Sequence, residues 1–308
     1  MNRTASSLPA PPAAPHAHPS QVLPLVEELA TALRIAGITD PRRSAADILA
    51  ALLDVQRSWP SMNHEAALES DLVARARRAA QLLGAGAPFA YAVGCSQFRN
   101  LNLVVDQRVL IPRPETEVLV DLILDSVRAS HGSSGNWGVA LDIGTGSGAI
   151  ALSLASEGRF DRVIATDTSV DAIDVAEENA RRLAGAISTP VEFRSGSLLA
   201  PVKDIRAALL VSNPPYISFA EIDMLPASVR DWEPPVALFS AHDGMAVTAA
   251  IVQDGARALV SGGLLALEVD VRRASLVAEL VMSDSSYAGV RVGLDLTGRE
   301  RFVFASRV

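Results

Sequence analysis

Four consecutive residues, Asn213-Pro214-Pro215-Tyr216, carry the most specific chemistry in this chain, and they directly follow the apolar run 207–211. Two prolines in a row fix φ and remove two backbone donors, so the main-chain carbonyls of Asn213 and Pro214 cannot join a regular sheet ladder. A rigid turn at the end of a strand then presents one side-chain carbonyl and one main-chain carbonyl to the same point. Such a pair suits a planar NH2 group, which has two hydrogens to donate. The sequence therefore predicts a site that holds an amide or an exocyclic amine.

A second candidate site is the glycine-rich loop that follows the apolar strand ending at Ile143. The loop residues are Gly144, Thr145, Gly146, Ser147 and Gly148, and a helix begins directly after them. Glycine is needed where the backbone approaches a ligand closely or takes a positive φ. Asp167 lies about 20 residues further on, at the spacing where a carboxylate accepts hydrogen bonds from ribose hydroxyls. We therefore expect a cofactor that carries a ribose.

The loop by itself does not distinguish a nicotinamide cofactor from S-adenosylmethionine. Gly144, Gly146 and Ala149 also satisfy the dinucleotide pattern G-x-G-x-x-[GA]. Two observations favour S-adenosylmethionine. Asp142 stands just before the loop, where a carboxylate suits a cationic methionine moiety and disfavours a pyrophosphate. The amide-holding turn should also face the loop across the switch point of the sheet, and a nicotinamide enzyme has no need of such a turn.

Both candidate sites require a sheet that brings them together, and the second half of the chain has the pattern of one. Strands that alternate with amphipathic helices indicate an α/β fold with a doubly wound, seven-stranded, mostly parallel sheet. The last two strands have only a short connection, so they should pair antiparallel. The expected strands are 139–143, 162–166, 190–194, 207–211, 263–268, 289–293 and 301–305, with helices at 148–157, 169–183, 245–260 and 272–282.

The first 112 residues have a different character. Residues 1–20 are rich in proline and alanine, a composition that cannot pack, and we expect them to be disordered. From residue 21 to about 83 the apolar residues recur at helical spacing, which predicts a small helical bundle. One helix should start at Asp40-Pro41 and a third should cover 65–83. Apolar and polar residues alternate over 98–105, which predicts a β-hairpin.

Composition narrows the function further. The 308 residues carry a net charge of −8, so bulk electrostatics do not favour binding to nucleic acid. The single cysteine, Cys95, cannot form an internal disulfide or a thiolate metal cluster. The N-terminus lacks the pattern of a signal peptide, and no apolar run approaches the length of a membrane span. We therefore expect a cytoplasmic protein without a metal site.

Together these motifs resemble a bacterial protein-glutamine N5-methyltransferase of the HemK type, which methylates the glutamine of the Gly-Gly-Gln motif in peptide-chain release factors. The resemblance covers nearly everything from about residue 75 onward. Its most specific part is the string Leu-Ile-Pro-Arg-Pro-Glu-Thr-Glu at 110–117 combined with the turn at 213–216. The turn alone is less specific, because amino-methylating DNA enzymes share it. Further matches lie at 86–98, 233–238 and 243–244.

The resemblance implies a helical substrate-docking domain over 21–87, a hairpin linker over 88–112 and a class I methyltransferase domain over 113–308. It also implies S-adenosyl-L-methionine as methyl donor, S-adenosyl-L-homocysteine as product, and release factors as partners. Separately, we expect a monomer that contacts neither membrane nor nucleic acid. The cofactor would be held by Gly144, Thr145, Gly146, Ser147, Gly148, Asp167, Leu198 and Asn213. The substrate amide would be held by Asn213, Pro214, Pro215 and Tyr216, of which Asn213, Pro214 and Tyr216 would be catalytic.

Three positions depart from the family pattern. Ser197 stands where an acid usually follows glycine, which would weaken recognition of the adenine amino group. Asp270 and Arg273 stand where the family usually has glycine and glutamine. We expect the loop that carries these two residues to be peripheral to methyl transfer.

Other functions stay open on the residues alone. The same turn could hold an exocyclic base amine of DNA or RNA, which would require a flipped base and a basic surface. The glycine loop alone also fits a nicotinamide-dependent reductase. A third possibility is a binding module that has kept the pocket without catalysis. Titration with S-adenosylmethionine against NAD, and an assay of methyl incorporation, separate these functions.

Overall fold

The computed structural model describes residues 20–132 and 135–308. The chain divides into two units, one ending at Ala85 and the other beginning at Gly86. The tail expected over residues 1–20 lies outside the described residues, except for Ser20, which begins a short strand. Among the described residues, no helix is both long enough and apolar enough to cross a membrane.

The first unit is built on amphipathic helices whose apolar faces form its core. They are α1 (Val22–Ile35), α2 (Pro41–Leu53), the short α3 (Trp59–Met62) and α4 (Ser70–Gly84). As predicted, α2 begins at Pro41 with Asp40 at its N-cap. The helix predicted over 65–83 is wrong in its first part, because Ala67–Leu68 (β2) pairs antiparallel with Ser20–Gln21 (β1). This strand partner lies far away in the sequence, so helical spacing could not reveal it.

The second unit contains the predicted seven-stranded sheet, with the strand order β10-β11-β9-β8-β5-β6-β7. Its strands are β5 (Val139–Ile143), β6 (Arg162–Asp167), β7 (Val191–Ser195), β8 (Ala207–Ser212), β9 (Leu259–Glu268), β10 (Tyr287–Leu294) and β11 (Glu300–Arg307). Strands β5 to β9 pair in parallel, whereas β11 pairs antiparallel with both β9 and β10. The doubly wound fold and the antiparallel final pair are thereby confirmed. The helix predicted to reach residue 260 ends earlier, since β9 already begins at Leu259.

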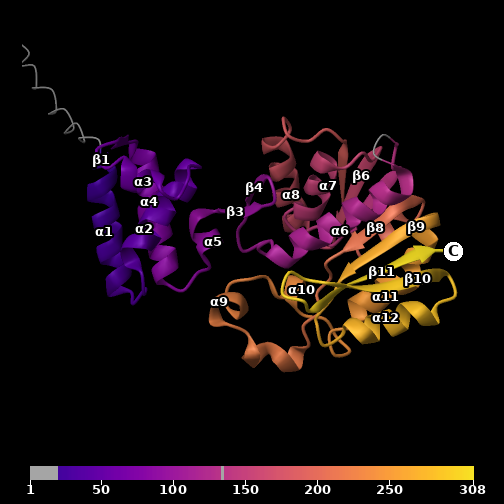
Figure 1. Ribbon diagram of the computed structural model, residues 1–308. Helices are drawn as coiled ribbons and strands as arrows, with labels where there is room; N and C mark the ends of the chain where they lie inside the picture. The colour runs from indigo at the N-terminus through magenta and orange to yellow at the C-terminus, as the bar shows by residue number, and fades with distance from the viewer. Residues whose placement is uncertain (1–19, 133–134) are drawn as a thin grey trace, which may run out of the picture. The chain divides into compact units, whose positions relative to one another are not determined.

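Helices cover both faces of this sheet (Figure 1). They are α6 (Pro114–His131), α7 (Ala149–Glu157) and α8 (Val170–Arg182), and then α11 (Ala246–Ala258) and α12 (Ala274–Ser283). Because side chains alternate along a strand, Ala140 packs into the core under α6 and α7, whereas Leu141 packs into the core under α11 and α12. Both residues are fully buried. Strands buried on both faces are typical of parallel sheets.

The predicted hairpin is formed by β3 (Cys95–Phe98) and β4 (Leu101–Val104), preceded by the short α5 (Phe89–Val93). A buried amide, that of Asn179, ties the hairpin to the second unit's glycine loop and α8. The Oδ1 atom of Asn179 accepts from Val104 N at 2.7 Å, and its Nδ2 donates to Val104 O at 3.0 Å and to Ser147 O at 2.9 Å. Asn179 therefore joins the hairpin, α8 and the glycine loop.

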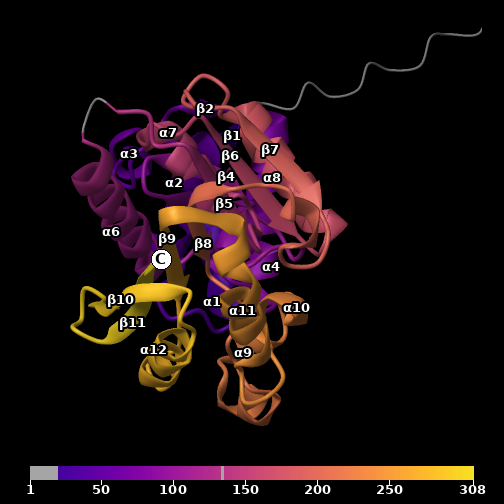
Figure 2. The ribbon, with the colours of Figure 1, turned by 90° about the vertical axis from the view of Figure 1, so that its right-hand side faces the viewer.

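A long excursion follows β8 and carries the short elements η2 (Phe219–Met224), α9 (Ala227–Arg230) and α10 (Pro235–Leu238). In both ribbon views this orange segment extends beyond the sheet (Figures 1 and 2). A further turn, η1 (Ala200–Val202), precedes β8. The sequence analysis predicted none of these elements, because single helical turns leave no periodic pattern.

Candidate active site

A cavity of about 530 Å³ opens at the carboxyl ends of β5, β6 and β8. This is where a doubly wound sheet binds its ligands. Its wall includes seven of the predicted site residues, namely Gly144, Gly146, Asp167, Leu198, Asn213, Pro214 and Pro215. Two motifs that the sequence analysis identified separately thus border one cavity.

The glycine loop leaves open space where side chains would otherwise project. Gly144 has a φ of 77° and Gly146 a φ of 56°, in the left-handed region that favours glycine. A Cβ atom built on either residue would meet no heavy atom within 4 Å. The loop is therefore a cradle whose free side is available to a ligand.

Asp142 shapes the loop from beneath rather than lining the cavity. Its Oδ2 accepts from Thr145 Oγ1 at 2.7 Å and from Ala151 N at 3.1 Å. Burial raises the pKa of Asp142 to about 7, although these two hydrogen bonds lower it from what burial alone would give. The Oδ1 atom is buried and has no hydrogen-bond partner in the described part of the chain.

Three predicted cofactor residues lie behind the loop rather than in the wall of this cavity, as far as the described residues go. The side chain of Thr145 is directed to Asp142, and the carbonyl of Ser147 accepts from Asn179. Gly148 is the N-cap of α7, and a Cβ there would lie 3.1 Å from the side chain of Leu152. These residues hold the shape of the loop from the inside.

Asp167 closes the other side of the loop. Its Oδ2 accepts from Gly146 N at 2.9 Å and its Oδ1 from Ser169 N at 2.9 Å. Burial raises the pKa of Asp167 above its ordinary value, against the lowering effect of these backbone donors. Each carboxylate oxygen keeps a second lone pair, so Asp167 can brace the loop and still accept from a ligand in the cavity.

Leu198 borders the cavity from a strained backbone position. Its φ is 50°, which is uncommon for a residue with a branched side chain. Its carbonyl accepts from Thr166 Oγ1 at 3.3 Å, which holds this turn against β6. The resulting wall is apolar at Leu198 and polar at the neighbouring Ser197.

The turn 213–216 separates the main cavity from a second one of about 200 Å³. Tyr216 lines only the smaller cavity, whereas Asn213, Pro214 and Pro215 border both. Tyr216 is half-buried, and Arg301 Nη2 donates to its hydroxyl at 3.1 Å. The turn is therefore reached from two sides, one of which contains the glycine loop.

Two residues that the sequence analysis did not assign to the site lie behind Asn213. The Nδ2 atom of Asn213 donates to Thr116 Oγ1 at 3.1 Å, and Thr116 Oγ1 donates to Glu268 Oε2 at 2.7 Å. Thr116 belongs to the first turn of α6, and Glu268 is the last residue of β9. The sequence did offer one signal for Glu268: it is a carboxylate at the end of β9, the strand next to β8. Neighbouring parallel strands end at the same edge of a sheet, so Glu268 could have been placed near Asn213.

The outer wall of the main cavity comes from the excursion after β8. The rings of Phe219 and Phe239 stack with their centroids 5.4 Å apart, and both border the cavity. Arg113 Nη2 donates to the buried carboxylate of Glu233 at 2.5 Å. This ion pair joins the Pro-Arg-Pro string to the Glu-Pro-Pro string, so two motifs that are remote in sequence are structural partners.

Comparison with known proteins identifies the family. Residues 25–94 match the PrmC N-terminal domain, and residues 120–225 match the methyltransferase small domain. The release factor glutamine methyltransferase of Moorella thermoacetica is 36% identical, with 89% of this chain and 94% of that protein aligned. That of Deinococcus radiodurans is also 36% identical, over 93% of this chain and 99% of that protein. The chain belongs to the release factor glutamine methyltransferase family.

Solved structures share the fold of this family member. A methyltransferase from Pyrococcus furiosus aligns with a TM-score of 0.50 and 18% identity, covering 68% of this chain and 91% of that one. The hMettl16 catalytic domain, solved in complex with MAT2A 3′UTR hairpin 1, aligns with a TM-score of 0.55 and 15% identity over 84% and 90% of the two chains. At these identities the likeness supports the class I methyltransferase fold alone.

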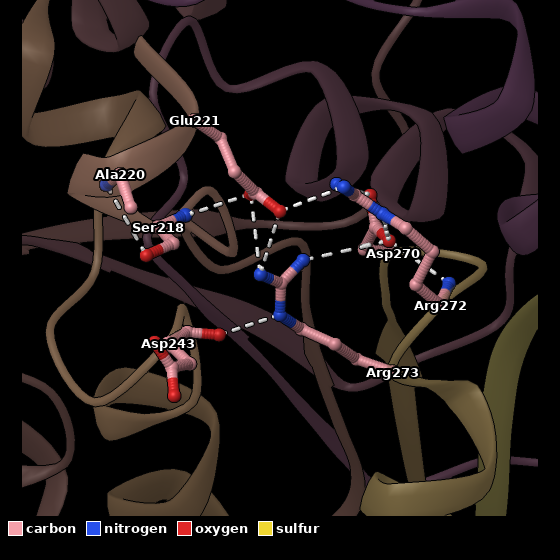
Figure 3. Close-up of polar contacts among 7 residues, drawn as sticks. All are labelled: Ser218, Ala220, Glu221, Asp243, Asp270, Arg272 and Arg273. Carbon is pink, nitrogen blue, oxygen red and sulfur yellow. Dashed lines mark hydrogen bonds and ion pairs between the residues drawn. The ribbon is translucent and has the colours of Figure 1, made fainter.

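Two of the three positions that depart from the family pattern, Asp270 and Arg273, belong to one charged cluster (Figure 3). Arg273 lies at its centre, with Nη2 donating to both carboxylate oxygens of Glu221 at 3.1 Å and Nε donating to the carbonyl of Asp243 at 2.5 Å. Asp270 lies 3.5 Å from Arg273 Nη1. Arg272 pairs with the carboxylates of Asp270 at 2.8 Å and of Glu221 at 2.7 Å.

This cluster links the loop after β9 to the wall of the cavity. Glu221 also closes a capping box with Ser218 at the start of η2, the element that carries Phe219. Through Glu221, the loop of Asp270 and Arg273 holds the segment that borders the cavity. That this loop is peripheral to methyl transfer stays a prediction.

Proposed function

We propose that this release factor glutamine methyltransferase transfers a methyl group from S-adenosyl-L-methionine to the side-chain amide nitrogen of the glutamine in the Gly-Gly-Gln motif of release factors. S-adenosyl-L-homocysteine would be the second product. The observation that carries the proposal is the continuity of the main cavity, because the glycine loop and the turn 213–216 border the same space. A methyl donor in the loop and an amide on the turn would be neighbours there.

The residues of the cavity fit the proposed cofactor. Gly144 and Gly146 would make room for its methionine part, Asp167 would accept from its ribose hydroxyls, and Leu198 would pack beside its adenine. Bound S-adenosylmethionine supplies an electrophilic methyl group, whose departing sulfur takes the electron pair of the broken carbon–sulfur bond. The protein then has to bring a nitrogen lone pair into line with that methyl group.

We assign this task to the turn. The substrate NH2 group would donate one hydrogen to Asn213 Oδ1 and the other to the Pro214 carbonyl, which leaves the nitrogen facing the cofactor side. An amide nitrogen is a weak nucleophile, so fixed orientation is the main contribution that the site can make. Positive charge grows on the nitrogen as the new bond forms, and the two acceptors hold it more strongly than they hold the neutral amide. One amide proton finally leaves to water.

The test is transfer of labelled methyl from S-adenosylmethionine to a purified release factor. We expect incorporation into the intact factor and none into a factor whose Gly-Gly-Gln glutamine is replaced by asparagine. Asn213→Ala should lower kcat by about a hundredfold and leave the affinity for S-adenosylmethionine within about twofold. Equal labelling of the two factors, or labelling of DNA or RNA instead, would refute the proposal.

The same proposal predicts where in the cell the enzyme acts and in which oligomeric state. A substrate that acts in translation would be met in the cytoplasm. We also propose that the enzyme acts as a monomer on the protein factor alone, in keeping with the net charge of −8, which does not favour nucleic acid.

A further inference from the structure

Three segments converge behind the amide of Asn213. The Nδ2 atom of Asn213, at the end of β8, lies 3.1 Å from Thr116 Oγ1 in the first turn of α6. That hydroxyl lies 2.7 Å from Glu268 Oε2 at the end of β9. Thr116 is 4% exposed and Glu268 is fully buried. Water therefore does not compete for these hydrogen bonds.

The orientation of the Asn213 amide decides whether the proposed site attracts or repels its substrate. The oxygen and the NH2 group of an amide have nearly the same shape but opposite hydrogen-bonding character. With Oδ1 facing the cavity, Asn213 accepts from the substrate NH2 group. After a half turn of the amide, two NH2 groups would face each other and the site would lose one of its acceptors.

The direction of the hydrogen bonds behind Asn213 selects the useful orientation. An ionised carboxylate only accepts, so the single hydroxyl hydrogen of Thr116 must be donated to Glu268. The Thr116 oxygen can then only accept, and the donor available to it is Asn213 Nδ2. We propose that Thr116 and Glu268 are positioning residues that fix the Asn213 amide with its oxygen toward the substrate. This inference rests on the proposed function.

The negative charge on Glu268 sets the direction of the hydrogen bonds from Asn213 to Thr116 and from Thr116 to Glu268. Its other oxygen, Oε1, lies 3.5 Å from Arg301 Nη2. The groups that face it are Arg113, Glu115 and Thr116 around the start of α6, Tyr216 from the turn and Arg301 from β11. Burial raises the pKa of Glu268 to about 7, and Thr116 and Arg301 lower it from what burial alone would give. A protonated Glu268 can donate to Thr116, which removes the constraint on Asn213.

The first test removes and restores the hydroxyl. Thr116→Val keeps the shape but neither accepts nor donates, and kcat for a release factor should fall about a hundredfold. Thr116→Ser restores the hydroxyl and should recover most of kcat. Calorimetric affinity for S-adenosylmethionine should stay within about twofold in both variants, which shows that the cofactor site is intact. Thr189→Val, which removes another buried hydroxyl remote from the cavity, is the matched control.

The second test uses pH, which a purely structural role would not affect. In the wild type, kcat should fall about tenfold per pH unit below about 7, as for one essential ionised group. Glu268→Gln has no ionisable group and can donate to Thr116, so its kcat should be low and independent of pH in this range. A Glu268→Gln variant that keeps the wild-type pH limb would overturn the inference, as would a Thr116→Val variant with normal kcat.

A third measurement needs no substrate, so it separates this inference from the proposed function. In protein labelled with 15N-asparagine, the side-chain NH2 signals of Asn213, assigned by their loss in Asn213→Asp, should shift with an apparent pKa near 7. Glu268→Gln and Thr116→Val should abolish that shift. If the wild type fails to methylate release factors but the shift is present, the proposed substrate is wrong and the positioning role stands. Asn213 NH2 signals that are identical in the wild type, Glu268→Gln and Thr116→Val at every pH would refute the positioning role.

Discussion

At Asp167 one carboxylate has a structural task, and in the proposed function it also has a ligand-binding one. Its two oxygens accept from the backbone of Gly146 and Ser169, which holds the glycine loop against the end of β6. The same side chain borders the main cavity, where we expect it to meet the ribose. Asp167→Ala would remove the ligand contact and loosen the loop at the same time, so a loss of affinity could not be assigned to either effect.

A narrower substitution separates the two tasks. Asp167→Asn keeps the size of the side chain and one acceptor oxygen, so the loop can keep one of its braces, but the negative charge and half of the acceptors are lost. Hydrogen bonds to a charged group contribute about 1.5–3 kcal/mol, so the affinity for S-adenosylmethionine should fall about tenfold to a hundredfold. Calorimetric titration measures this, with Thr189→Val, which removes a buried hydroxyl outside the cavity wall, as the control that keeps its affinity. Unchanged affinity in Asp167→Asn would remove Asp167 from the cofactor site.

The sequence made Asn213, Asp167 and the glycine positions predictable because each belongs to a local motif. Proline neighbours or strand-end spacing identified these residues without reference to any other segment. Thr116 and Glu268 were not predictable in this way, because their role depends on a hydrogen bond between residues 152 positions apart. Only the parallel pairing of β8 with β9 and the packing of α6 beside them bring the two together.

At the scale of elements, the wall that carries Phe219 depends on charge rather than on a large core. The element η2 is a single short stretch, Phe219–Met224, and none of its residues is buried. This element is anchored by Glu221, whose side chain is 17% exposed. Glu221 pairs with Arg273, whose side chain is 10% exposed. Burial raises the pKa of Glu221, but the Ser218 N–H and Arg273 outweigh this, so its net pKa lies below the ordinary value.

Breaking this pair should loosen the wall on the substrate side. In Glu221→Gln and in Arg273→Gln we expect KM for the release factor to rise several-fold, because the segment has to be ordered again when the substrate binds. The affinity for S-adenosylmethionine should change less than KM. In the double variant the two effects should not add, since residues in one ion-pair network couple energetically.

The matched control is Arg257→Gln on α11, which removes an exposed pair with Asp254. Exposed pairs contribute little, so its KM should equal that of the wild type. Steady-state kinetics at low and high salt completes the experiment, because the difference between wild type and Glu221→Gln should shrink as salt screens the pair. Additive effects of the two substitutions would mean that Glu221 and Arg273 do not act as one unit.

The strands and long helices were predictable from sequence, because apolar periodicity extends over several turns or residues of each. The segment after β8 that borders the cavity was not predictable, because η2, α9 and α10 are too short to show an apolar periodicity. The strand β2 was mistaken for helix for a related reason: its two residues gain their conformation from pairing with β1, and not from their own propensity.

At the scale of the whole molecule, two carboxyl groups are buried at the edge of the sheet where the parallel strands end. Asp142 at β5 and Glu268 at β9 are both fully buried, and burial raises the pKa of each to about 7. Their ordinary pKa values are 3.8 and 4.5. Between these values and 7, the folded protein keeps protons that the unfolded chain has released.

This difference gives the stability of the ligand-free enzyme a definite pH dependence. The stabilising contribution is complete below the ordinary pKa values and is lost as the pH rises through about 7, because the folded state binds more protons than the unfolded state in that window. The free energy of unfolding should therefore decrease from about pH 5 to pH 7, by up to about 1.4 kcal/mol per pH unit for each group. Urea denaturation at closely spaced pH values measures it.

The slope can be assigned to the two groups by substitution. Asp142→Asn and Glu268→Gln should each flatten the decrease between pH 5 and pH 7, whereas Asp125→Asn, an exposed position on α6, should leave it unchanged. Carboxyls whose pKa lies below the ordinary value, such as Glu192, have the opposite slope, but only in more acidic solution. A free energy of unfolding that rises with pH from 5 to 7 would contradict the assignment. In that case both carboxylates would be ionised throughout, and the Asn213 amide would keep its orientation at every pH at which the enzyme is folded.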